Sequence, residues 1–171
     1  MYCNVQKKCL HTRTQIINCR TLLDDERLNE LDSALTEKGI DICALQETRR
    51  DGFFCVPTDN YSVYTFGECS GSRGVGFAIH NRLAHPTAAR GVSNTHGRIM
   101  LVDVLLYNAT HPATIICAYS PANYSLPAKR NKFYTQLAKV YCDRYPNLHR
   151  ILLLIYICLS YLVQMAQQYS W

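Results

Sequence analysis

The stretch IDICALQETRR, residues 40–50, begins as an apolar segment and ends in an amide, a carboxylate and two guanidinium groups. Its first part is apolar on both alternating faces, which is typical of a strand buried between other layers of an α/β domain. A strand that only leads into a turn usually ends in Gly, Asn, Asp or Pro. Gln46 and Glu47 follow this strand instead, so its end is the first candidate for a functional site.

The residues before this strand predict a strand and a helix. Residues 14–18, TQIIN, are rich in β-branched side chains and predict a strand. Asp24 or Asp25 is placed to cap a helix that ends at Gly39. Three leucines recur on one face of that helix: Leu28, Leu31 and Leu35. The chain therefore opens with a strand, a helix and a second strand.

The rest of the chain predicts further strands and one more helix. Four apolar segments separated by loops of Gly, Ser, Asn and Pro are expected as strands at residues 61–66, 74–80, 98–106 and 114–119. Because no helix intervenes, most of their pairings should be antiparallel. A helix over residues 128–144 and a strand over 150–156 follow. The pattern indicates a mixed α/β domain, with sheets packed on each other and helices outside.

Composition limits the class of protein. The chain has 171 residues, which suits one domain, and its 48% hydrophobic and 18% charged residues are typical of a globular protein. The net charge of +5 is compatible with a polyanionic partner, although many unrelated proteins share it. The first residues contain no apolar signal segment.

The cysteines and the apolar end of the chain bear on compartment and membrane. The nine cysteines form no C-x-x-C pair, and their odd number argues against a disulfide framework, so we expect no disulfide partner. A reducing compartment, the cytosol or nucleus, is the expected location. The apolar run over residues 151–163 is shorter than the roughly 18–20 residues that a spanning helix needs, so a membrane-associated chain is only a minor alternative.

The order of the motifs resembles a known family. INCRTL, a helix, IDICALQETR, the glycine-rich GSRGVGFAI, RIMLVDV and ICAYSPAN follow one another. This series resembles the endonuclease/exonuclease/phosphatase family, and especially the endonuclease domain of LINE-type, non-long-terminal-repeat retrotransposons and proteins derived from them. The resemblance covers about residues 14–154. It implies a four-layered α/β sandwich of the deoxyribonuclease type and Mg²⁺-dependent hydrolysis of a nucleic-acid phosphodiester, with DNA favoured over RNA.

The resemblance also implies a set of site residues. Asn18 matches the family's asparagine at a strand end, Glu47 its metal-binding glutamate, and Tyr119 the active-site tyrosine of a Y-x-P turn. Mg²⁺ prefers oxygen ligands, so Glu47 and Asn18 are expected to hold it. Without the family pattern, each of these three residues would pass for an ordinary strand-end or turn residue.

Other positions are expected to contact nucleic acid or depart from the family. The expected contacts are Arg49, Arg73, Arg98 and Asn123, although exposed arginines are more often plain surface charge. Arg20 stands where some family members have an aspartate. Ala122 directly follows the Y-x-P proline, where the family often has the asparagine that this chain places one step later.

The later motifs of the family are absent from this sequence. After HRILLLI the family has GDFN and then an Asp-His pair, which serve the attack of water, whereas this chain reads YICLSYLVQMAQQYSW. We therefore expect an incomplete domain over residues 14–155 that lacks the C-terminal strands, with exposed strand edges between residues 74 and 119. Residues 156–171 would form a divergent apolar tail.

Two functions remain open from the sequence. The first is an Mg²⁺-dependent, endonuclease-like phosphodiester hydrolase whose activity is impaired or lost. The alternative is a non-catalytic, retrotransposon-derived remnant with at most weak binding of nucleic acid.

Overall fold

The part of the chain that the structure describes contains two β-sheets and two helices. The computed structural model describes residues 12–68, 71–83, 86–105, 112–122, 124–144 and 151–156. The first sheet has the order β1-β2-β5-β4-β3, with β1 (Thr14–Asn18), β2 (Ile42–Gln46), β3 (Gly52–Pro57), β4 (Tyr61–Gly67) and β5 (Val75–His80). The second has the order β6-β7-β8-β9, with β6 (Pro86–Gly91), β7 (Ile99–Val104), β8 (Ala113–Tyr119) and β9 (Ile151–Tyr156). The helices are α1 (Asp25–Glu37) and α2 (Pro127–Arg144).

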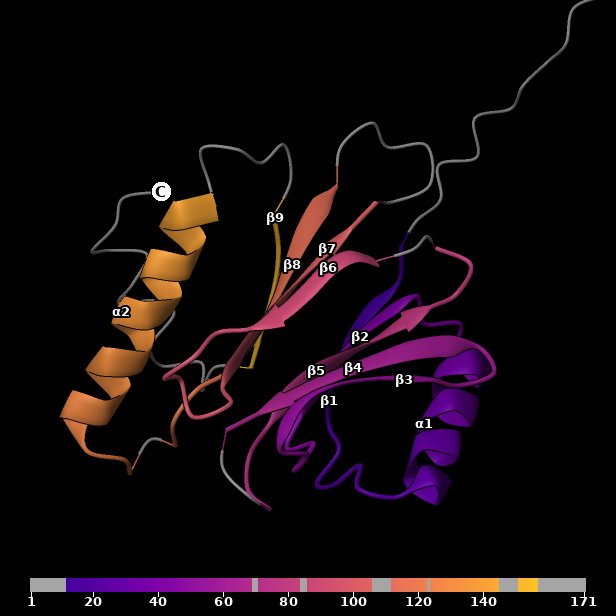
Figure 1. Cartoon of the computed structure of the whole chain (residues 1–171), viewed down its shortest axis with the longest axis horizontal. Coiled ribbons are helices and arrows are strands. Elements are labelled where there is room, and N and C mark those ends of the chain that lie inside the picture. Colours follow the sequence, from indigo (N-terminus) through magenta and orange to yellow (C-terminus); the bar gives the residue numbers. More distant parts are fainter. Residues whose placement is uncertain are drawn as a thin grey trace, which may run out of the picture.

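These elements are stacked in four layers. The two sheets face each other, α1 lies outside the first sheet and α2 lies outside the second (Figure 1). One apolar cluster joins α1 to the first sheet through residues such as Leu35 and Leu45. A second lies between the sheets and includes Phe77 and Met100, and a third joins the second sheet to α2. The layering expected from the sequence is present in the described residues.

The helix α1 is fixed at both ends by the predicted signals. The Asp24 side chain accepts a hydrogen bond from the backbone N–H of Arg27 at 2.8 Å, which caps the first turn. Asp25 and Glu26 place negative charge at the positive end of the helix dipole. Beyond the last turn, Gly39 has a φ of +63°, a conformation that glycine adopts without steric cost.

The pairing of strands brings three strand ends to one place. β1 and β2 are parallel, with Asn18 opposite Gln46, so Asn18 and Glu47 lie where the carboxyl ends of these two strands meet. β5 runs antiparallel to β2, and the loop before β5 returns to the same strand ends. There the backbone N–H of Arg49 donates to the carbonyl of Arg73 at 2.8 Å. Tyr119 ends β8 in the facing sheet.

The structure corrects two expectations about strands. The sequence pattern predicts no strand at β3 or β6, which are both edge strands. The strands between residues 74 and 119 were expected to have exposed edges, but β5, β7 and β8 each lie between two neighbours, and only β6 lies at an edge. The strand expected at residues 150–156 is β9, which pairs in parallel with β8. The remainder of the apolar tail lies outside the described residues.

A buried carboxylate connects α1 to the turn between β3 and β4. The side chain of Asp32 is almost fully buried and accepts hydrogen bonds from the hydroxyls of Thr36 and Thr58 at 3.2 and 2.5 Å. It also accepts from the backbone N–H and the side-chain amide of Asn60 at 2.9 and 2.7 Å. This carboxylate is therefore a structural joint.

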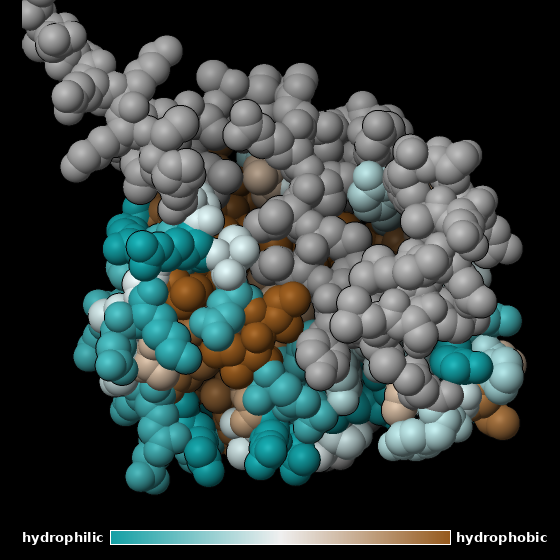
Figure 2. Space-filling view, turned by 180° about the vertical axis from the view of Figure 1, so that it is seen from behind, coloured by the Kyte–Doolittle hydropathy of each residue, from teal (hydrophilic) through white to brown (hydrophobic). Residues whose placement is uncertain are grey.

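The described surface in Figure 2 is mostly polar, and the described cysteines form no disulfide. Seen from behind, the described surface is largely hydrophilic, with apolar residues exposed among the polar ones (Figure 2). In the described part of the chain, neither helix is both long and apolar enough to cross a membrane. The described cysteines are free thiols, and burial raises the pKa of Cys19 to about 11 and that of Cys117 to about 12.

Candidate active site

Glu47 stands at the centre of the candidate site. It follows β2 directly, with a φ of +54° that is uncommon for a residue with a side chain and typical of functional positions. The Asn18 side-chain amide donates to Glu47 Oε1 at 2.9 Å, and the Tyr119 hydroxyl donates to the same oxygen at 2.7 Å. The carboxylate thus joins β1 and β2 of one sheet to β8 of the other.

The hydrogen bonds decide the charges of this group. The hydrogen bond from Asn18, and after it the bond from Tyr119, lowers the pKa of Glu47. Burial acts in the opposite direction and raises this pKa, whereas the positive charges of Arg49 and Arg20 lower it further. Burial raises the pKa of Tyr119 to about 12, and the bond to Glu47 and its negative charge add to this rise. At neutral pH the site therefore contains an ionised carboxylate and a protonated phenol that remains a donor.

Arg98 contacts both the backbone and the ring of Tyr119. Its Nη1 donates to the carbonyl oxygens of Tyr119 and Ser120 at 3.0 and 3.1 Å. The guanidinium carbon also lies 5.3 Å from the centre of the Tyr119 ring, within the range of a cation–π contact. Arg98 therefore has a positioning role as well as a charge near the site.

A pocket opens beside Glu47 and carries an excess of positive charge. Its volume is about 460 Å³. Its walls are formed by Glu47, Arg49, Gly71, Ser72, Arg73, Arg98, Tyr119, Ser120, Ala122, Tyr124 and Ser125. Three arginines and one carboxylate thus line the pocket, and Arg49 Nη2 lies 3.9 Å from Glu47 Oε2. Such a pocket suits an anion with several acceptor oxygens, such as a phosphate.

The backbone around the pocket is bent to bring the arginines together. Arg49 and Arg73 both have left-handed φ values, of +58° and +63°. Gly74, which follows Arg73, has a φ of +85°. It packs so closely against Thr48 that an added Cβ would lie 2.4 Å from the Thr48 hydroxyl. The glycine-rich segment predicted as a turn therefore carries Arg73 to the same pocket as Arg49.

The structure brings together most of the residues proposed from the sequence. Asn18, Glu47 and Tyr119 form one hydrogen-bonded group, and the three proposed arginines line the adjacent pocket. Asn123 lies outside the described residues. Arg50, the neighbour of Arg49 in the sequence, donates to the backbone carbonyl of Leu22.

Two features of the site were not foreseen. Gln46 is fully buried, and neither its Oε1 nor its Nε2 has a hydrogen-bond partner among the described residues. Tyr124, on the loop before α2, also lines the pocket, and it is an exposed residue. The only signal for Tyr124 in the sequence is an aromatic residue inside the polar segment PANYS.

The donor set limits what metal the site suits. Among the described residues, no three His, Cys, Asp or Glu side chains gather as metal ligands. Mg²⁺ binds through one or two carboxylates and completes its shell with water and substrate phosphate. Oε2 of Glu47 accepts neither the Asn18 bond nor the Tyr119 bond. The residues present therefore fit a magnesium ion held by Glu47 and, beyond it, by water and phosphate oxygens.

Solved structures share this fold, although no family model and no curated protein matches the sequence. The endonuclease domain of the telomere-specific non-LTR retrotransposon TRAS1 aligns with 84% of this chain and 57% of its own, at 13% identity and a TM-score of 0.53. An AP endonuclease from Archaeoglobus fulgidus aligns with 79% of this chain and 51% of its own, at 18% identity and a TM-score of 0.52. TDP2 from D. rerio, complexed with a single-strand DNA product, aligns with 83% and 57%, at 12% identity and a TM-score of 0.52.

The chain spans only about half to six tenths of these three proteins. The identities are low, so the likeness concerns the fold. Over about four fifths of its length, this chain has the fold of the endonuclease/exonuclease/phosphatase nucleases.

Proposed function

We propose that the pocket beside Glu47 binds a phosphodiester of a nucleic acid, DNA before RNA, and that the chain is a magnesium-dependent, endonuclease-like hydrolase of low activity. One observation carries this proposal. The hydrogen-bonded group of Asn18, Glu47 and Tyr119 borders the same pocket as three arginines. The structural neighbours support it, because their names describe two endonucleases and a protein with a DNA product.

Each side chain has a distinct task in this proposal. The arginines bind and orient the phosphate through charge-assisted hydrogen bonds. The Tyr119 hydroxyl, whose single proton is donated to Glu47, holds that carboxylate in place, and Arg98 keeps the Tyr119 ring in position. Glu47 carries a negative charge that opposes the approach of a phosphate. When bound there, Mg²⁺ supplies the positive charge that offsets this repulsion and polarises the phosphodiester.

A second candidate is binding without cleavage. Hydrolysis needs a group that takes a proton from water, and such groups contribute about 10²- to 10⁴-fold to rates. Among the described residues that line the pocket, Glu47 is the single carboxylate and no histidine is present. Its Oε1 already accepts two hydrogen bonds. This observation favours slow cleavage or none.

Plasmid nicking separates the two candidates. We expect the full chain to relax supercoiled DNA slowly with Mg²⁺ and not with a chelator, and Glu47→Gln to remove this activity. Glu30→Gln, an exposed residue of α1, is the matched control and should leave nicking unchanged. Equal silence of the wild type and Glu47→Gln, with both proteins folded by circular dichroism, would favour binding alone.

Oligonucleotide binding tests the pocket whatever the result of nicking. Each arginine that contacts a phosphate should lower the slope of log affinity against log salt by about 1 when it is removed. We expect this change for Arg49→Ala and Arg73→Ala, and none for Arg27→Ala, which lies on α1. If all three variants bind like the wild type, the pocket is not the nucleic-acid site.

A further inference from the structure

Tyr124 is an exposed aromatic side chain on the rim of the arginine pocket. It lies on the loop between β8 and α2, and the residue is 95% exposed. Aromatic side chains bury a large apolar area when they pack in a protein, so a fully exposed ring leaves this area available to a ligand. It lines the same pocket as Arg49 and Arg73.

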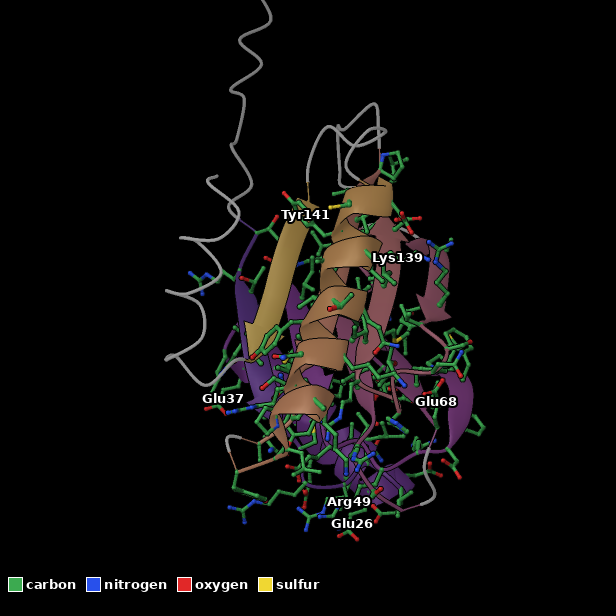
Figure 3. All side chains as sticks on the ribbon, turned by 90° about the vertical axis from the view of Figure 1, so that its left-hand side faces the viewer. Glu26, Glu37, Arg49, Glu68, Lys139 and Tyr141 are labelled. Carbon is green, nitrogen blue, oxygen red and sulfur yellow. The ribbon has the colours of Figure 1, made fainter. Side chains whose placement is uncertain are left out.

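Positive charge continues beyond the ring. Lys129 and Lys132 are exposed in the first turns of α2, which begins three residues after Tyr124. Arg49 lies toward the end of the molecule at which α2 begins, whereas Lys139 lies farther along the helix (Figure 3). Exposed cations therefore follow Tyr124 closely in the sequence, in addition to the arginines of the pocket that it lines.

Single-stranded nucleic acids are bound by this combination of groups. A positive groove holds the backbone, and aromatic rings stack on the bases, whose flat faces are open in a single strand. In a duplex these faces are covered by the neighbouring base pairs. An exposed tyrosine beside a phosphate pocket therefore fits an unpaired base better than a paired one.

We propose that Tyr124 is a stacking platform for an unpaired base of a nucleic acid whose adjacent phosphate occupies the arginine pocket. The proposal rests on the function proposed above, because it requires a phosphate in that pocket. It adds the substrate class: single-stranded or locally unpaired nucleic acid, with little preference for sequence, because every base has a face that can stack.

The test measures binding of the full chain to three fluorescent probes by anisotropy. These are a thymidine 12-mer, an abasic 12-mer of the same charge, and a duplex of the same length. We expect the thymidine strand to bind about tenfold more tightly than the abasic strand, and Tyr124→Ala to remove this difference. Tyr124→Phe, which keeps the aromatic face, should retain it. Leu126→Ala is the matched control. Leu126 is 65% exposed on the same loop, so the substitution removes exposed apolar surface but no aromatic ring.

The outcomes separate this inference from the proposed function. Equal, salt-dependent binding of the thymidine and abasic strands would overturn stacking but leave the phosphate pocket standing. An equal loss in Tyr124→Ala and Leu126→Ala would also overturn it, because plain apolar contact would then suffice. Absence of binding to all three probes by the folded chain would overturn both proposals. Quenching of a 2-aminopurine base by the wild type, but not by Tyr124→Ala, would confirm the stack directly.

Discussion

Asp32 and Glu47 are two carboxylates with similar bonds and different surroundings. Both accept hydrogen bonds from uncharged side chains, and both have a pKa below the ordinary value. Asp32 lies in a regular helix, is 7% exposed, and is surrounded by the turn that it holds. Glu47 lies just after a strand with a left-handed backbone, and its side chain is 25% exposed beside a pocket lined with arginines.

The difference indicates what distinguishes the structural carboxylate from the one that we propose as functional. A lowered pKa and several donors do not make the distinction, since Asp32 has both. Access to a pocket, an uncommon backbone conformation and unequal use of the two oxygens do make it. Asp32 uses both oxygens for the fold, whereas Glu47 offers only Oε1 to Asn18 and Tyr119.

The largest expected effect is the loss of stability on removing Asp32. Asp32→Ala leaves the half-buried amide groups of Asn60 without their acceptor and removes one of the two acceptors near the Thr58 hydroxyl, and a buried polar group left unpaired costs about 1–3 kcal/mol. We expect the free energy of unfolding in urea to fall by about 3 kcal/mol. Asp32→Asn, which keeps one acceptor oxygen, should lose less. A loss no larger than that of Glu47→Gln would erase the distinction between the two carboxylates.

The next effect is the dependence of stability on pH. Burial raises the pKa of Asp32, but the hydrogen bonds from Asn60, Thr58 and Thr36 lower it by more, so its folded pKa lies below the ordinary 3.8. A lowered folded pKa means that its contribution is complete above the unfolded value and is lost as the pH falls through the folded value. Urea midpoints measured from pH 6 down to pH 3 should fall, and they should fall less steeply in Asp32→Asn. Identical slopes would contradict this account.

Glu47→Gln should change the site more than the stability. The amide can still accept from Asn18 and Tyr119, so we expect a loss below about 1 kcal/mol in the free energy of unfolding. The negative charge that helps to raise the pKa of Tyr119 to about 12 is removed, so this pKa should fall while burial keeps it above the ordinary 10. Because the chain has 12 tyrosines, NMR of labelled rings with Tyr119→Phe as the assignment control is the suitable measurement. An unchanged tyrosine pKa would show that the Glu47 bond is not made in solution.

The smallest effect is expected for a carboxylate with neither role. Glu30 forms an ion pair with Arg27 at 3.1 Å on the exposed surface of α1, and more than half of each side chain is accessible to solvent. Solvent screening limits such pairs to a few tenths of a kcal/mol. Glu30→Gln should therefore shift the urea midpoint by less than either other carboxylate variant, and a larger shift would show that exposure is a poor guide to role in this fold.

The sequence predicted the regular parts of the fold and the centre of the site. Apolar periodicity located α1 and β2, because burial of one helical face and of a whole strand leaves a strong pattern. The same periodicity also places Asp32 four residues after Leu28, on the buried face of the helix. A buried charge requires partners, so this position predicts a hydrogen-bonded carboxylate. The edge strands β3 and β6 were missed because GFFCVP and PTAARG carry no alternation and are held by backbone pairing along one side.

The pocket itself was beyond reach of the sequence. Each arginine was proposed by itself as a contact to nucleic acid, and in the structure Arg49 and Arg73 reach the shared pocket on left-handed backbone. Such bends depend on close approaches between segments distant in the chain, such as Gly74 against Thr48. No local pattern encodes them. Tyr124 was missed for a similar reason, because its exposure depends on how the loop before α2 lies against the second sheet.

The hydrogen bond between Tyr119 and Glu47 also ties the site to the folding of the chain. The two residues are 72 positions apart and belong to different sheets, so the bond closes a long loop and forms only when the sheets dock. During synthesis, the first sheet can assemble well before the site exists. A ligand that binds across this bond binds only the docked sandwich, so by mass action it resists the separation of the two sheets. Nucleic acid would then act on this chain as a folding ligand.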